Sequence, residues 1–78
     1  MIDAILLILK SHFERARQKH PDFGGMICVL REVADLIKAD ERNSREEVKR
    51  QALHVAVTAL RLYEMELKRD CHAGQKDA

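Results

Sequence analysis

Apolar residues recur every three or four positions along most of this chain, in three separate blocks. The blocks cover residues 2–19, about 26–39 and about 45–69. Such spacing keeps apolar side chains on one side of a helix with about 3.6 residues per turn. In the first block the positions concerned are Ile2, Ile5, Leu6, Leu9, Phe13 and Ala16. The pattern therefore predicts an all-α fold of three helices in a single domain, residues 1–70.

Short polar segments separate the blocks and predict where the helices end. Pro21 disfavours helical backbone in the residue before it, and Gly24 and Gly25 favour a turn. Ser44, followed three residues later by Glu47, matches the capping box that starts many helices. Residues 71–78 are predicted to form a flexible tail. Because short connections make neighbouring helices antiparallel, we expect an antiparallel three-helix bundle.

The third predicted helix is apolar on two sides. One stripe consists of Val48, Ala52, Val55, Ala59 and Leu62. The other consists of Leu53, Ala56, Leu60, Tyr63 and Leu67. In a unit of three helices, the other two helices cover only one of these stripes. A helix that is apolar on two sides is buried on two sides, so the second stripe needs another cover. We therefore predict that a homo-oligomer, a homodimer or tetramer, completes the core, with the first and third helices in its interface.

Composition narrows the classes of partner. The chain has 78 residues, 46% of them hydrophobic and 35% charged, which is typical of a soluble helical protein. Lysine and arginine number 14 against 13 acidic residues, so the net charge of +1 predicts no specific nucleic-acid partner and no membrane partner. Cys28 and Cys71 are far apart and form no CxxC pair, which suits a reducing, cytoplasmic setting. The apolar run 4–9 is too short to span a membrane.

Two polar pairs lie within the predicted helices. Glu32 and Asp35 are three residues apart and so share one face of the second helix. Carboxylates at this spacing suit Mg²⁺, although the same spacing is common on the solvated rim of amphipathic helices. Gln51 and His54 have the same spacing on the third helix. An imidazole there can bind a metal, donate to a phosphate or carry a proton, or it can be a hydrogen-bonded structural residue.

Basic residues cluster near the start of the third helix, at Lys49 and Arg50, and Arg61 follows further along it. Such side chains recognise phosphate groups, but they also fit a solvated face with ion pairs to acids such as Glu46. No histidine has a partner at HxxxH spacing, and neither serine nor cysteine stands in a nucleophile motif. The sequence therefore predicts neither a structural zinc site nor a nucleophilic triad.

Three stretches carry a family resemblance: His20-Pro21-Asp22-Phe23, the segment 29–36, and the segment 45–61. Between about Lys19 and Leu67 the chain resembles the small phage and mobile-element members of the MazG-like, all-α nucleotide pyrophosphohydrolase superfamily. That superfamily carries E-E-x-x-E on one helix and E-x-x-D on the next. Its members bind magnesium through these acids and cleave nucleoside triphosphates to monophosphate and pyrophosphate.

The resemblance implies roles for particular residues. Glu32 and Asp35 match the last two acids of the first motif and would bind Mg²⁺, with Arg31 in place of the first acid. Gln51 and His54 occupy the positions of the second acidic pair and would be the catalytic positions, with His54 as a further metal ligand or orienting the attacking water. The phosphate-binding residues would be Lys49, Arg50 and Arg61.

The departures from the family pattern bear on activity. Magnesium selects hard oxygen ligands, and neutral side chains at both positions of the second pair remove about two negative charges that would offset the ion. The implied function is a protein that acts on or binds nucleoside triphosphates, with reduced or no pyrophosphohydrolase activity. The alternative is a non-catalytic, oligomeric helical binding module for a nucleotide or a protein partner, again of phage or mobile-element type.

Overall fold

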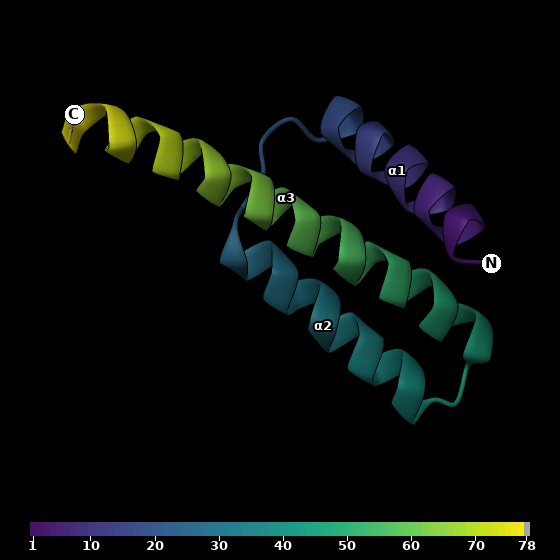
Figure 1. Ribbon diagram of the computed structural model, residues 1–78. Coiled ribbons are helices and arrows are strands. Elements are labelled where there is room, and N and C mark those ends of the chain that lie inside the picture. The colour runs from purple at the N-terminus through teal and green to yellow at the C-terminus, as the bar shows by residue number, and fades with distance from the viewer. Residues whose placement is uncertain (78) are drawn as a thin grey trace.

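Helices α2 (Met26–Glu41) and α3 (Arg45–Asp77) pack side by side in antiparallel orientation and form the centre of the molecule (Figure 1). The computed structural model describes the backbone of residues 1–77 and the side chains of residues 1–71. A tight turn over residues 42–44 joins the two helices. Asn43 adopts a left-handed conformation there, with φ 55°, which asparagine tolerates better than most residues. The half-buried or buried residues of α2 are Cys28, Val29, Glu32, Val33, Asp35, Leu36 and Ala39.

Helix α1 (Ile2–Lys19) lies on the other side of α3 from α2 and runs parallel to α3 (Figure 1). Helix α1 packs against α3 less extensively than α2 packs against α3. Within the described residues, α1 makes no contact with α2. An ion pair of 3.6 Å between Arg17 Nη1 and Glu64 Oε2 links α1 to α3. The three helices therefore form an open layer with α3 in the middle. The all-α prediction is confirmed, and the described residues contain no strand.

The helix boundaries follow the apolar periodicity closely at their starts. Helix α1 has its predicted extent, and α2 ends at Glu41, two residues after the predicted end at Ala39. Helix α3 begins at Arg45 as predicted but continues past residue 69 to Asp77, so it includes most of the segment 71–78 that was expected to be a tail. The last residue of that segment, Ala78, lies outside the described residues. No helix in the described part of the chain has both the length and the apolar character needed to cross a bilayer.

A single chain buries little of its apolar surface. Within the described residues the buried hydrophobic side chains are Ala39 and Val57. The accessible surface is 6291 Å², whereas a compact monomer of 9.0 kDa exposes about 4,900 Å². The radius of gyration is 14.8 Å, against about 11.5 Å for a compact domain of this length. Part of the difference is the end of α3, which projects beyond the other helices (Figure 1).

The segment 20–25 crosses from α1 to α2 and is held against α3. Gly25, the residue before α2, has φ 72° and ψ −140°, a conformation that is open to glycine and strained for other residues. The guanidinium of Arg61 lies over the Phe23 ring, 4.9 Å from its centroid. Arg61 Nη2 also donates a hydrogen bond of 2.6 Å to the carbonyl oxygen of His20. These contacts hold the connecting segment against α3.

Candidate functional site

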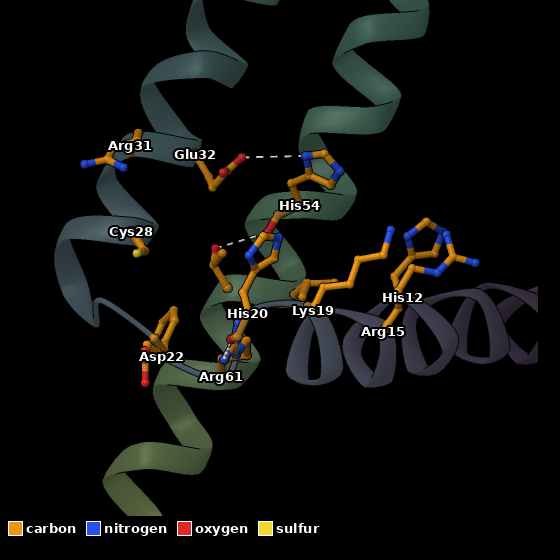
Figure 2. Close-up of a pocket in the computed structure, with 14 residues that line it drawn as sticks. His12, Arg15, Lys19, His20, Asp22, Cys28, Arg31, Glu32, His54 and Arg61 are labelled. Atoms are coloured by element: carbon orange, nitrogen blue, oxygen red, sulfur yellow. Dashed lines mark hydrogen bonds and ion pairs between the residues drawn. The ribbon is translucent and has the colours of Figure 1, made fainter.

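Glu32 and His54 face each other across the α2–α3 interface. Glu32 Oε2 lies 3.7 Å from His54 Nδ1, and both side chains are partly exposed (Figure 2). Because the helices are antiparallel, three residues forward on α2 correspond to three residues back on α3. This register places Asp35 level with Gln51, one turn from the Glu32–His54 pair. The two polar pairs singled out in the sequence therefore lie at facing positions of neighbouring helices.

Gln51 carries an unsatisfied polar atom. Its side-chain oxygen Oε1 is buried and has no hydrogen-bond partner among the described residues. A buried acceptor without a donor destabilises the fold by about 1–3 kcal/mol. Within the described residues, the Gln51 acceptor Oε1 therefore forms no structural hydrogen bond.

A cavity of about 570 Å³ opens beside the Glu32–His54 pair. This volume falls within the range of roughly 300–1,000 Å³ typical of small-molecule sites. Its wall draws on α1, the connecting segment, α2 and α3 (Figure 2). The charged and imidazole side chains of the wall are His12, Arg15, Lys19, His20, Asp22, Arg31, Glu32, His54 and Arg61.

Positive charge is concentrated in this cavity. With the imidazoles neutral, four cationic side chains and two carboxylates give the wall a net charge of +2, although the whole chain carries only +1. Among the described residues, the four cations Arg15, Lys19, Arg31 and Arg61 form no ion pair with a carboxylate. The cavity therefore presents unneutralised cations to whatever enters it, and its chemistry suits an anion.

Helix α1 supplies the cations that the sequence reasoning missed. His12, Arg15 and Lys19 project from the same side of α1 and line the cavity, with the Lys19 amine directed toward His12 (Figure 2). Their spacing of three and four residues is the helical signal that could have grouped them. The sequence does not reveal that this side of α1 faces the polar pair on α2 and α3, because that depends on how the helices pack.

The three predicted phosphate-binding residues separate in the structure. Arg61 lines the cavity, whereas Lys49 and Arg50 do not. Lys49 Nζ lies 3.2 Å from Glu46 Oε1, and both side chains are largely exposed. This arrangement matches the solvated-face interpretation of the basic cluster. Asp35 and Gln51 do not line the cavity either, while Glu32 and His54 do.

Arg61 is the most firmly positioned cation of the cavity. Its contacts with the Phe23 ring and the His20 carbonyl hold the guanidinium in place before any ligand arrives. A guanidinium has five N–H donors, so the bond to His20 leaves others free. Arg31, by contrast, lies on the rim at α2, and its side chain points away from His54 (Figure 2).

The residues present fit a magnesium ion poorly. Mg²⁺ prefers several oxygen ligands in an octahedral arrangement, with carboxylates to balance its charge. In the described residues, no group of three or more histidine, cysteine, aspartate or glutamate side chains is placed to hold a metal. One of the two candidate carboxylates, Glu32, is already beside His54, and cations surround the cavity. The donor set therefore favours an anion over a divalent cation.

Comparison with known proteins adds no relative. No family model, no curated protein and no solved structure matches the chain.

Proposed function

We propose that this chain binds nucleoside triphosphates in the cavity between α1, α2 and α3, on a scaffold like that of the MazG-like pyrophosphohydrolases. The observation that carries the proposal is the cavity itself, which joins the Glu32–His54 pair to unpaired cations contributed by α1 and α3. Arginine and lysine bind phosphate through short, charge-assisted hydrogen bonds. The order of the motif helices in the resemblance agrees with this location.

The catalytic part of the proposal depends on the resemblance. In that resemblance Glu32 and Asp35 would hold magnesium and His54 would orient water, so pyrophosphate release is the activity to measure. We expect a panel of nucleoside triphosphates with Mg²⁺ or Mn²⁺ to identify the substrate. In Glu32→Gln any pyrophosphate release falls at least about a hundredfold, the usual loss when one member of a charge-stabilising site is removed.

A matched control distinguishes the site from a general charge effect. Glu46→Gln makes the same change at an exposed carboxylate that pairs with Lys49, outside the cavity, so it keeps the wild-type rate. Full activity in Glu32→Gln would rule out the proposed site. Nucleotide binding without pyrophosphate release identifies the alternative, a binding module without catalysis, and the poor fit to magnesium favours that outcome.

We also propose that the functional protein is a homo-oligomer. The single chain exposes about 1,400 Å² more surface than a compact monomer of its mass. A standard interface buries roughly 800 Å² on each partner, so one isologous contact accounts for much of the excess. The most exposed apolar stripe of α3 consists of Leu60, Tyr63 and Leu67, which are 40%, 57% and 50% exposed. A second copy that covers this stripe leaves the cavity free, because the cavity residues of α3 lie on its other side.

A further inference from the structure

We infer that the cavity binds the polyphosphate group directly through Arg15, Lys19 and Arg61, with no divalent ion between protein and phosphate. The inference rests on the proposed function only for the nucleoside part of the ligand. The polyphosphate part follows from the charges and geometry of the cavity.

The wall of the cavity carries more cationic side chains than carboxylates. Carboxylates repel phosphate, so a site built from acids needs a metal ion to bridge the two. Here the wall has two carboxylates, Asp22 and Glu32, against the three cations of the proposed site and Arg31 on the rim, and Glu32 lies beside His54. A triphosphate chain carries several negative charges, and the unpaired cations of the wall can meet them without an intermediary.

The cations of the cavity come from two different helices. Arg15 and Lys19 are one turn apart and rise from one side of α1, while Arg61 reaches the same cavity from α3 (Figure 2). A chain of linked phosphates can therefore be contacted from two sides. Arg61 is already ordered by Phe23 and the His20 carbonyl, so little side-chain freedom is lost when it binds.

Magnesium should then weaken binding instead of enabling it. A divalent ion on the triphosphate neutralises two of its negative charges, which are the charges that the arginines and the lysine recognise. The site offers the ion too few oxygen ligands to compensate. We therefore expect ATP to bind more tightly in EDTA than in excess Mg²⁺, and its affinity to fall as salt rises.

The test is isothermal titration of the full chain with inorganic triphosphate, ATP and AMP, each with EDTA and with excess Mg²⁺. We expect triphosphate and ATP to bind in EDTA, ATP the more tightly, and AMP to bind at least about tenfold more weakly than ATP, because fewer charge-assisted contacts form. Lys19→Gln weakens ATP binding roughly tenfold, and Arg61→Gln weakens it further.

Lys10→Gln is the matched control. It removes one positive charge from the same helix, but Lys10 is exposed and does not line the cavity, so affinity stays within about twofold of wild type. Because Arg61 also holds the connecting segment, Lys19→Gln keeps the test valid if Arg61→Gln fails to fold. Equal losses in Lys19→Gln and Lys10→Gln would overturn the inference, since they would show a general effect of charge.

The outcomes separate the inference from the proposed function. ATP binding that requires Mg²⁺ would overturn the metal-free inference and leave nucleotide binding intact. Triphosphate binding in EDTA with no gain for ATP supports the metal-free site and overturns the nucleotide function. Absence of binding by every probe in both conditions overturns both.

Discussion

Two adjacent glycines in the connecting segment have different physical roles. Gly25 has φ 72°, a backbone conformation that a side chain strains. Gly24 has no such φ, but a Cβ there would lie 2.6 Å from Cys28 Sγ. The sequence predicts a turn from the glycine pair and cannot distinguish the two reasons, because one is a matter of backbone conformation and the other of a neighbour brought close by folding.

Replacing Gly25 with alanine should lower the free energy of unfolding by about 1–3 kcal/mol, the usual strain of a non-glycine residue in that region. Urea denaturation followed by circular dichroism measures the change. The control is Gly24→Ala in a Cys28→Ala background, which removes the obstructing sulfur and should stay close to Cys28→Ala alone. An equal loss at both glycines would contradict the backbone explanation.

Gln51 and His54 provide a direct test of the family resemblance at the residue scale. They stand where the superfamily carries an E-x-x-D pair, and the register places them opposite Asp35 and Glu32. The double substitution Gln51→Glu with His54→Asp therefore creates a cluster of four carboxylates. Like charges this close repel, so the variant should be less stable than wild type without metal.

Magnesium should reverse that loss in the double variant. The four carboxylates supply the oxygen ligands that the wild-type chain lacks, so we expect the Tm of the variant to rise with Mg²⁺ while that of wild type stays nearly constant. Differential scanning fluorimetry across a magnesium titration measures both. A variant whose Tm ignores magnesium would argue against the correspondence between these positions and the family motif.

At the scale of the helices, Leu60, Tyr63 and Leu67 form an exposed apolar stripe on α3, and α1 and α2 also expose large apolar side chains. Tyr63 is 57% exposed in the single chain, so a substitution there should hardly affect a monomeric fold. If a second copy covers the stripe, Tyr63→Glu places a charge in an apolar interface and should weaken self-association at least about tenfold.

Analytical ultracentrifugation over a range of concentrations measures that change. Arg50→Gln alters the net charge by the same single unit on the same helix and leaves the stripe untouched, so its association should match wild type. Identical association of Tyr63→Glu and wild type would show that this stripe is not the interface.

Most of the helical elements could be predicted from the sequence, because helix boundaries depend on local periodicity and on residues such as Pro21 and Gly25. The continuation of α3 to Asp77 could not, since the polar residues beyond Arg69 carry no apolar repeat to indicate a helix. The sequence does indicate that Glu32 and His54 lie near each other, because each belongs to a polar pair of the same spacing on neighbouring helices. The contribution of Arg15 and Lys19 depends on how α1 is turned against α3, which no local pattern encodes.

At the scale of the whole molecule, the two apolar stripes of α3 and the open layer of helices both indicate that one chain leaves apolar surface uncovered. The stripes indicate that one chain has too few helices to cover α3, and the structure locates the uncovered area on α1, α2 and the far side of α3. Periodicity identifies which sides are apolar but not what covers them. The cavity can form within one chain, whereas the proposed second copy would cover the apolar area that the layer leaves exposed.

The stability of the protein should therefore depend on its concentration. For a homodimer that unfolds to separate chains, each tenfold rise in concentration adds roughly 1.4 kcal/mol to the free energy of unfolding of the dimer. In chains of this length that corresponds to a rise in Tm of several degrees. Calorimetry of wild type over a hundredfold range of concentration tests this, with Tyr63→Glu as the comparison, whose Tm should be lower than that of wild type at each concentration. A wild-type Tm that does not change, together with a monomer mass at every concentration, would mean that the single chain tolerates its exposed apolar surface and that no second copy is needed.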